Sequence, residues 1–448
     1  MSPTQAAERR ASHQRVFTNA ALVGLLATVA KLAGAAKIMV TARYFGAGDQ
    51  LDAFVIAFLL PAFFTDIVAG SFGASFVPAF IRVRTDQGDA AARVFARTGL
   101  TLVLAAMLAV SVLLAAGGRW VLPLLGSSFS PEKLQLTASL FLALILWLPM
   151  SACIAVWRAV LNAHNSFALA AAAPLTTPLA TIIFLYAGAY RWSIYTLCWG
   201  TLGGVAVETI LLGWGVHRLR IPILPAWRGW NPEMSAIRDQ YVPLLAGTML
   251  AALCPLIDQA VAGSLHSGSV SALTYGTKLA SVLAAISGTA IATAVLPEFS
   301  RLAAHRDWSH LRHAVRIHSA VIILLGVPAV GGIIWLSSPI VRTFFEGGAF
   351  DESATRVVTS VQQFALLQVP FAILFVVVSR LAVAISATSV MIRASLFTLI
   401  ATTVGDLVLS RTMGIAGIPL AGALAQAIAI ASLVYFLYRR EPRLFRVS

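Results

Sequence analysis

The sequence predicts an all-α polytopic membrane protein of about twelve transmembrane helices, and three observations support that prediction. Of its 448 residues, 59% are hydrophobic and 11% are charged, whereas an ordinary soluble domain has roughly 45–50% apolar and about 25% charged residues. The mean hydropathy is +0.85. Apolar runs long enough to cross a bilayer recur along the whole chain, and they are continuous rather than alternating, so they indicate helices and not barrel strands.

Twelve apolar segments are expected to form the helices, several of them longer than the ~20 residues that a span needs. Their expected ranges are 17–44, 53–81, 95–116, 135–161, 166–189, 193–216, 240–264, 270–300, 316–338, 358–384, 388–410 and 413–438. The polar, basic stretch before them precedes an apolar run that is too long for a signal-peptide core. We therefore expect a cytoplasmic N-terminal tail.

The basic residues predict the orientation. If both termini are cytoplasmic, most of the 32 Lys and Arg residues fall in the inside segments, as the positive-inside rule requires. Topology therefore explains the net charge of +14 better than a nucleic-acid partner does. We expect a multi-pass protein of the bacterial inner membrane with both termini in the cytoplasm.

The longest polar linker, at about 218–239, divides the chain into two halves of six helices. We expect an N-terminal lobe over 1–220 and a C-terminal lobe over 221–448. In each half the second helix ends in a proline, an aromatic residue and an arginine, in SFVPAFIRV and AVLPEFSRL. A repeat of this kind predicts two lobes around a central cavity. The alternative is that membrane helices resemble one another by composition.

No enzyme signature is visible. The chain contains no GxxxxGK[ST], HExxH or GxSxG motif and no Cys/His metal-ligand spacing. The cysteines, Cys153, Cys198 and Cys254, lie within apolar runs and are interpreted as small core residues. We expect neither catalytic residues nor a cofactor.

Lysines within apolar helices are the first candidate functional groups. Lys31 and Lys37 lie in the first expected helix and Lys278 in the eighth, where a charge at mid-helix costs about 2.5–3.5 kcal/mol. The ammonium group of lysine suits phosphate oxygens. Pairing with a carboxylate or snorkelling to an interface is the alternative, and we favour a functional role for the three together.

Carboxylates within helices are the second group. Asp258 and Asp406 both lie in the second half, and if they converge they need a cation or a proton between them. Thr402, one turn before Asp406, would add an oxygen. A sodium or proton-coupling site and simple hydrogen bonding across helix interfaces are equally compatible with this pattern. Glu208 is open between function and structure, and Asp66 is interpreted as structural.

Several motifs resemble a known family. The stretch AKLAGAAKIMVTARYFGAGDQLDAFVIAFLLPAFF contains ARxFGAG-like and DAFxxAFxLP-like segments. VLNAHNSFALAAAAP, LIDQAVAGSLHSGSVSALTYGTKLASVL and FFEGGAFDESAT extend the likeness over nearly the whole chain. Together they resemble the MurJ/MviN family of lipid II flippases, within the multidrug/oligosaccharidyl-lipid/polysaccharide exporter superfamily.

The resemblance implies a basic central cavity that holds the pyrophosphate and sugars of a lipid-linked substrate while the polyprenyl tail stays in lipid. Lys31, Lys37 and Lys278 match positions where the family usually has arginine, and Asp52 matches the aspartate of the DAF segment. These four are the expected substrate-binding residues. Asp258 and, less closely, Asp406 fall on helices where some members bind sodium, so an ion-coupling site of Asp258, Thr402 and Asp406 is expected, with no other metal.

The chain also departs from the family pattern. Thr65 and Asp66 stand where the family has a basic pair, and Gly347 stands where it has arginine. The usual last two helices are expected to be absent, since the sequence stops at Ser448. A lateral opening is then expected between the first and eighth helices, whose small residues permit close approach.

The leading functional hypothesis is a flippase that moves an undecaprenyl-pyrophosphate-linked glycan, lipid II or a related exopolysaccharide precursor, across the inner membrane by alternating access. Its partners would be that anionic substrate and membrane lipids. The alternative is a cation-coupled multidrug exporter of the related toxin-extrusion group. The buried lysines oppose the cationic cargo of such an exporter, whereas Asp258 and Asp406 leave it open. A membrane enzyme of glycan assembly would need a large outer loop, and none is visible.

Overall fold

A computed structural model describes residues 3–227, 229 and 232–444. Over these residues the chain is helical apart from short connections, with no β-strand and one isolated bridge between Gly347 and Phe350. The first half contains α1 (Pro3–Phe45), α2 (Asp49–Leu125), α3 (Pro131–Leu144), α4 (Trp147–Ala163), α5 (Phe167–Ala172), η1 (Ala173–Leu175), α6 (Thr176–Trp192) and α7 (Tyr195–Arg218). The second half contains α8 (Pro232–Gly263), α9 (Ser269–Ala304), α10 (Trp308–Val321), η2 (Ile322–Gly326), α11 (Val327–Trp335), α12 (Ser337–Phe345), α13 (Glu352–Leu366), α14 (Gln368–Ala384), α15 (Thr388–Met413), η3 (Gly414–Ala416), α16 (Gly417–Arg440) and η4 (Pro442–Leu444).

Each of the twelve expected segments lies on helix in this structure. Within the described residues, ten helical segments are long and apolar enough to cross a membrane. One of the ten, Ser389–Arg440, covers both α15 and α16, and α8 adds a shorter apolar stretch, Gly247–Ala262. The prediction of an all-α polytopic membrane fold is confirmed.

The second and third expected helices are joined, which the sequence did not predict. α2 runs for 77 residues, with a break in its helical dihedrals at Gly88 (φ 84°, ψ 175°). That positive φ is readily adopted by glycine because it has no Cβ. The polar segment between the two spans was expected to be a loop. It stays helical on either side of Gly88, and Arg84 bonds to Asp89 across the break at 2.8 Å.

The chain divides into two compact units. Unit 1 comprises Met1–Tyr44, Ala57–Val121 and Gln135–Thr248, and unit 2 comprises Phe45–Ile56, Leu122–Leu134 and Met249–Ser448. Contacts therefore divide the chain at Thr248–Met249 and place both ends of α2 in unit 2. The predicted division into lobes after residue 220 remains a prediction.

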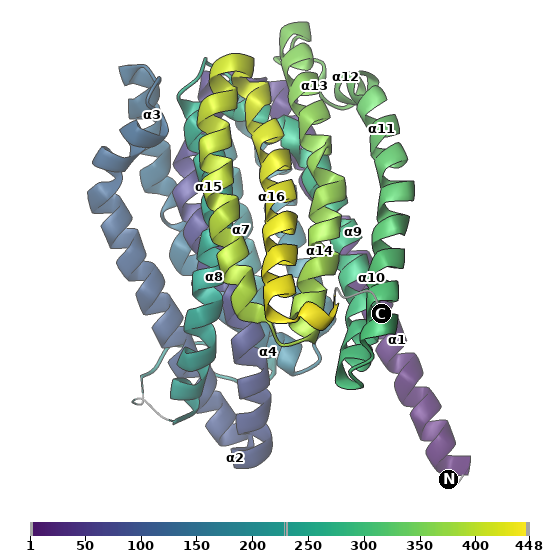
Figure 1. Ribbon diagram of the computed structural model, residues 1–448. Helices are drawn as coiled ribbons and strands as arrows, with labels where there is room; N and C mark the ends of the chain where they lie inside the picture. The colour runs from purple at the N-terminus through teal and green to yellow at the C-terminus, as the bar shows by residue number, and fades with distance from the viewer. Residues whose placement is uncertain (1–2, 228, 230–231, 445–448) are drawn as a thin grey trace. The chain divides into compact units, whose positions relative to one another are not determined.

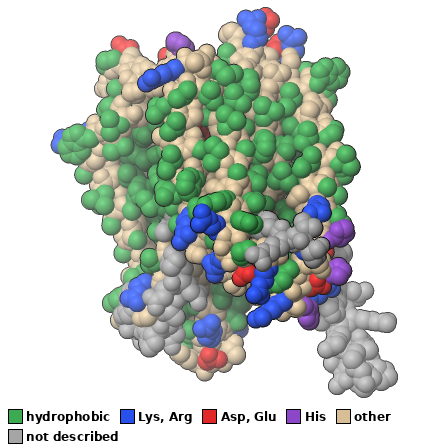
Figure 2. Space-filling model, viewed as in Figure 1, with side chains coloured by type: hydrophobic (Ala, Val, Ile, Leu, Met, Phe, Trp, Pro, Cys, Tyr) green, Lys and Arg blue, Asp and Glu red, His purple; other side chains and the backbone are tan. Residues whose placement is uncertain are grey.

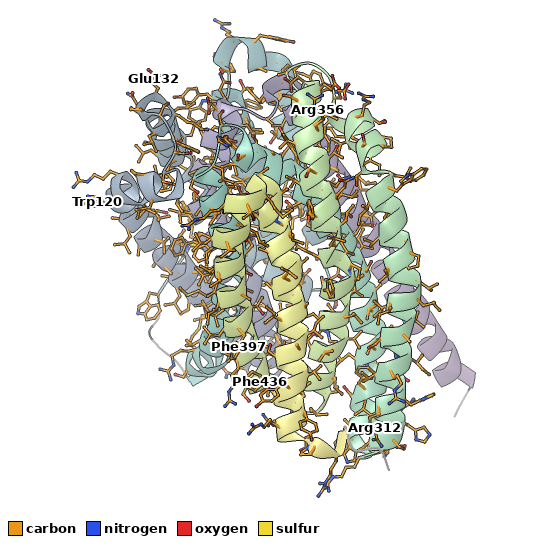
Figure 3. All side chains as sticks on the ribbon, turned by 45° about the horizontal axis from the view of Figure 1, so that its top comes forward. Trp120, Glu132, Arg312, Arg356, Phe397 and Phe436 are labelled. Carbon is orange, nitrogen blue, oxygen red and sulfur yellow. The ribbon has the colours of Figure 1, made fainter. Side chains whose placement is uncertain are left out.

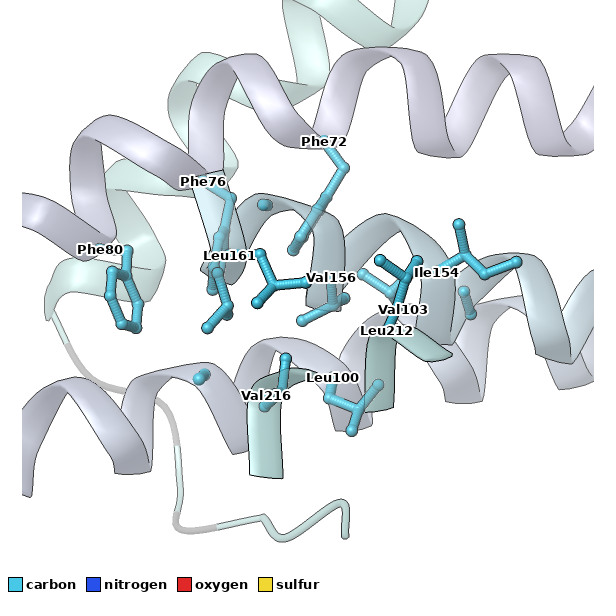
Figure 4. Close-up of a cluster of buried hydrophobic side chains, with 14 of the residues drawn as sticks. Phe72, Phe76, Phe80, Leu100, Val103, Ile154, Val156, Leu161, Leu212 and Val216 are labelled. Atoms are coloured by element: carbon cyan, nitrogen blue, oxygen red, sulfur yellow. The ribbon is translucent and has the colours of Figure 1, made fainter. Parts of the chain in front are cut away.

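Unit 1 is held by an aromatic and aliphatic core. Phe72, Phe76 and Phe80 project from α2 at helical spacing and are buried in one core with Leu161 of α4 and Leu212 of α7 (Figure 4). The rings of Phe72 and Phe76 are stacked with centroids 4.7 Å apart. This core fixes the rotation of α2, α4 and α7 and so decides which of their polar side chains face one another.

Unit 2 contains a second core around α9, α14 and α16. α15 packs on α16, and α14 packs on both α9 and α16, and these helices lie side by side in Figure 1. Arg356 on α13 and Arg312 on α10 lie toward opposite ends of this unit, and the rings of Phe397 and Phe436 meet with centroids 5.9 Å apart (Figure 3).

One side of α15 presents large apolar side chains to the surroundings. Leu396, Phe397, Ile400, Val404 and Leu407 are each about half exposed. Figure 2 shows hydrophobic side chains over this face of unit 2, with basic side chains gathered toward its ends. Such a face suits the hydrocarbon core of a bilayer, where apolar side chains need no protein partner.

Candidate functional site

Asp52 lies in a closed polar cluster within unit 2. Its Oδ2 accepts from the Lys133 ammonium at 2.8 Å and from the Gly268 backbone N–H at 2.7 Å. Its Oδ1 accepts from the Ser271 backbone N–H at 2.8 Å and from the Ser271 hydroxyl at 2.7 Å. The Asp52 side chain is fully buried. The carboxylate thus caps the N-terminus of α9 from another helix, where its charge is favoured by the helix dipole.

The surroundings of this cluster leave the carboxylate little freedom. Lys133 also bonds to Asp49 at 2.5 Å, and Ser267 donates to Asp49 at 2.7 Å. Gly268 has φ +84°, and a Cβ there would meet the Ala47 carbonyl oxygen at 2.6 Å, so this position requires glycine. The geometry does not support the predicted substrate-binding role of Asp52. It gives Asp52 a structural role that ties α2 to α3 and α9.

Asp258 and Asp406 are brought together, with Thr402 and Cys254 close by. Their carboxyl groups are close enough to interact electrostatically with each other and with the Cys254 thiol, which neighbours Thr402. Asp406 is fully buried and Thr402 is 3% exposed. Within the described part of the chain, both carboxylate oxygens of Asp406 and Oδ1 of Asp258 are buried without a hydrogen-bond partner.

A cavity of about 280 Å³ adjoins these groups in unit 2. Asp258, Thr402, Thr398, Gln368 and Gln426 supply its polar lining. Unpaired buried carboxylate oxygens are costly unless a cation or proton compensates them. Among the described residues no group of three His, Cys, Asp or Glu side chains is placed to hold a metal ion. A cation here would therefore rely on two carboxylates with hydroxyl and amide oxygens, a donor set that suits hard cations.

The three candidate lysines differ in their surroundings. Lys31 on α1 and Lys278 on α9 are exposed. Neither has a recorded ion-pair partner among the residues that the structure describes, although both lie within apolar spans. Lys37 is half-buried and does have a partner. Lys31 and Lys37 belong to unit 1 and Lys278 to unit 2, so a space shared by all three remains a prediction.

Glu208 on α7 pairs with Arg158 on α4. Nη2 of Arg158 donates to Oε1 of Glu208, and the Glu208 side chain is 7% exposed. The pair borders a cavity of about 550 Å³ in unit 1. The Arg158 guanidinium therefore compensates the charge of Glu208.

Sequence reasoning did not single out two cations that lie within the span Pro131–Ala163. Lys133 is buried on α3, and Arg158, whose side chain is 38% exposed, lies on α4. A signal for Arg158 was present, since Glu208 lies in an apolar run and needed a partner. Lys133 gave no such signal, because it follows Pro131 at the start of its helix.

These features define the class of protein. Ten apolar helical segments within the described residues, exposed apolar faces, and buried charges beside polar cavities are typical of multi-pass α-helical membrane transporters. The chain belongs to the lipid II flippase MurJ family, whose family profile matches residues 41–446.

Individual relatives agree with this assignment. The lipid II flippase MurJ of Burkholderia cenocepacia is 24% identical over 342 residues, which is 74% of this chain and 66% of that protein. The probable lipid II flippase MurJ of Rhizobium tropici is 25% identical over 426 residues, 92% of this chain and 78% of that protein. The match thus spans about two thirds of the length of the first relative.

Solved structures share the fold. The inward closed conformation of lipid II flippase MurJ aligns with a TM-score of 0.79 at 21% identity, covering 93% of this chain and 87% of that one. An inward-facing multidrug resistance MATE family transporter of the MOP superfamily aligns with a TM-score of 0.78 at 13% identity, covering 94% and 96%. At these identities the likeness shows the fold alone.

Proposed function

We propose that this protein moves an undecaprenyl-pyrophosphate-linked glycan, lipid II or a related exopolysaccharide precursor, across the bacterial inner membrane by alternating access. Membership of the lipid II flippase MurJ family over residues 41–446 is the observation that carries the proposal. The MATE likeness lies in the fold, and the sequence match favours a lipid-linked glycan over the cationic drugs of the alternative function.

The exposed lysines on apolar helices support an anionic cargo. Lys278 on α9 stands in a span of 36 residues, and no counter-ion is recorded for it in the described part of the chain. A cation within an apolar span favours the approach of an anion, because no other charge there compensates it. A pyrophosphate supplies that anion. Lys31 on α1 has the same character, and Lys37 completes the proposed basic set.

The carboxylate pair supports coupling to a cation. Asp258 and Asp406, with Thr402 and the adjoining cavity, would hold a sodium ion or a proton that drives or orders the transport cycle. A bound cation would compensate oxygens that otherwise lie buried and unpaired. The proposal includes an inner-membrane location with both termini cytoplasmic, which rests on the bias of basic residues toward the inside segments.

Reconstitution tests the function directly. The purified full chain is placed in liposomes with a fluorescent undecaprenyl-pyrophosphate-linked glycan, and transfer between leaflets is followed by quenching from outside. We expect transfer by the wild type, about tenfold less or lower by Lys278→Ala, and recovery by Lys278→Arg, which keeps the charge. Arg312→Ala, near the start of α10, is the matched control and keeps wild-type transfer.

A parallel assay separates the alternative. The same liposomes are loaded with a cationic dye and given a sodium or proton gradient. Dye export without glycan transfer would overturn the flippase proposal in favour of a multidrug exporter. Equal transfer by wild type and Lys278→Ala would remove Lys278 from the substrate site while leaving the flippase function standing.

A further inference from the structure

The cavity of about 550 Å³ in unit 1 has no part in the functions described above. Its volume lies within the range of small-molecule pockets, about 300–1,000 Å³. It is formed by α2, α4, α6 and α7, and each of these helices contributes polar side chains to its lining. The lining side chains that bear on its chemistry are Thr65, Asp66, Trp147, Arg158, Asn162, Thr177 and Glu208.

Several polar groups at this cavity lack a partner. Within the described residues, Nε1 of Trp147, Nε of Arg158 and Oγ1 of Thr177 are buried without a hydrogen bond. The Asp66 side chain, which also lines the cavity, is exposed. A buried polar group left unpaired costs about 1–3 kcal/mol. Three such groups around one cavity indicate that something polar fills it.

The charges around the cavity decide against an anion. The Arg158 guanidinium is already paired with Glu208, and Asp66 adds a second carboxylate. Two carboxylates face one cation, so a phosphate brought here would be repelled. The charges alone would accept an ammonium group, but the donors on Trp147 and Arg158 would then stay unpaired, since an ammonium group has no acceptor.

The mixture of donors and acceptors matches a different chemistry. Trp147 and Arg158 offer N–H donors, Asp66 offers acceptors, and the Thr177 hydroxyl and Asn162 amide offer both. A sugar hydroxyl or acetamido group also donates and accepts, and carries no charge. The indole of Trp147 adds an apolar wall with a polar edge.

We propose that this unit 1 cavity is a subsite for the uncharged sugar part of the transported headgroup. The proposal rests on the glycan flippase function and names the part of the substrate that the cavity takes. The pyrophosphate, which the two carboxylates would repel, binds elsewhere. The Arg158–Glu208 pair keeps both side chains in place for the hydroxyl groups of the sugar.

A soluble neutral sugar tests the subsite without the lipid. The probe is N,N′-diacetylchitobiose, added to the purified full chain in detergent, with affinity measured by calorimetry and ring contacts by saturation-transfer NMR. Trp147→Phe removes one N–H and keeps an aromatic ring, and Thr177→Val removes one hydroxyl at similar volume. Each change should weaken binding about five- to tenfold, as expected for one lost hydrogen bond.

Matched controls lie nearby in unit 1. Trp199→Phe changes a tryptophan that lines a separate cavity, and Thr209→Val changes an α7 threonine that bonds to its own helix at the Val205 carbonyl. Both should bind the sugar like the wild type. Inorganic pyrophosphate should not compete with the sugar. Thermal unfolding of each variant shows that it is folded.

The outcomes separate the subsite from the function. No sugar binding by the wild type, or unchanged affinity in both Trp147→Phe and Thr177→Val, would overturn the subsite and leave a cavity that holds water. Normal transfer of the lipid-linked glycan in that case would leave the flippase proposal intact. Sugar binding that depends on these two residues, in a protein that transfers no lipid-linked glycan, would support the subsite and overturn the flippase function.

Discussion

The ammonium of Lys133 lies 2.8 Å from Oδ2 of Asp52, and the two side chains are 6% and 0% exposed. Removing one partner of a buried ion pair leaves an uncompensated charge, which typically costs about 3–5 kcal/mol. We expect Lys133→Met to lower the free energy of unfolding by this amount, and the double change Asp52→Asn with Lys133→Met to lower it by less than the sum of the single changes. Denaturant unfolding in detergent measures both.

An exposed pair provides the control for this prediction. Arg356 and Glu352 are 3.1 Å apart, with side chains 70% and 65% exposed, so Glu352→Gln should change stability by about 0–1 kcal/mol. If Lys133→Met changed the stability as little as Glu352→Gln does, the buried pair would not hold α2, α3 and α9 together.

Sodium should stabilise the protein through Asp258, Asp406 and Thr402. A ligand that binds only the folded state raises the free energy of unfolding by about 2.7 kcal/mol when its concentration is 100 times its dissociation constant. We expect sodium, but not choline, to raise the unfolding temperature of the wild type, and the rise to vanish in Asp258→Asn and Thr402→Val. Thr403→Val is the matched control, because its hydroxyl bonds to the Leu399 carbonyl of the same helix. A sodium effect that survives in Asp258→Asn would refute this site.

The candidate lysines should face water and not lipid. In a variant whose three cysteines are replaced, single cysteines at Lys31 and Lys278 should react with a hydrophilic maleimide in intact membranes. A cysteine at Ile400, on the apolar face of α15 and 54% exposed, should not react. Labelling at Ile400 alone would mean that the lysines line no aqueous path, and the shared basic cavity would be abandoned.

The first turn of α13 should loosen in acid. The Ala354 backbone N–H, followed by the Ser353 hydroxyl, lowers the pKa of Asp351, which caps this helix. A carboxyl group whose pKa is lowered on folding stabilises the folded state at pH values above its unfolded-state pKa of about 3.9. This stabilisation is lost as the pH falls through the folded-state pKa. Hydrogen exchange at Ala354 and Thr355, corrected for intrinsic rates, should rise on acidification in the wild type. Asp351→Asn still caps but does not titrate, so its exchange should stay level.

Much of the fold could be predicted from the sequence because membrane spans are a local property. Continuous apolar runs of sufficient length locate helices without knowledge of their neighbours. All twelve expected segments lie on helix, and the approach of Asp258 to Asp406 was anticipated because two isolated carboxylates in apolar helices each need compensation. The junction at Gly88 was missed because a polar segment between two spans can be a loop or a water-exposed continuation of helix, and composition does not distinguish them.

The candidate sites were less accessible from the sequence. Asp52 was expected to bind substrate. Both oxygens of its carboxylate instead accept hydrogen bonds from Lys133, Gly268 and Ser271, which are 81 to 219 positions away in the sequence. The unit 1 cavity was not anticipated, because the side chains that line it are brought together only by the packing of α2, α4, α6 and α7.

The sequence by itself determined that this chain crosses a membrane many times, which segments cross it, and which ionisable groups are costly within those segments. Only the tertiary structure decided how those charges are compensated. Glu208 could pair with Arg158, 50 residues away, once the aromatic core of unit 1 had fixed the rotation of α4 and α7. The physical reason is that burial of an apolar run depends on its own residues, whereas a salt bridge between helices depends on the packing of every side chain that sets their rotation and separation.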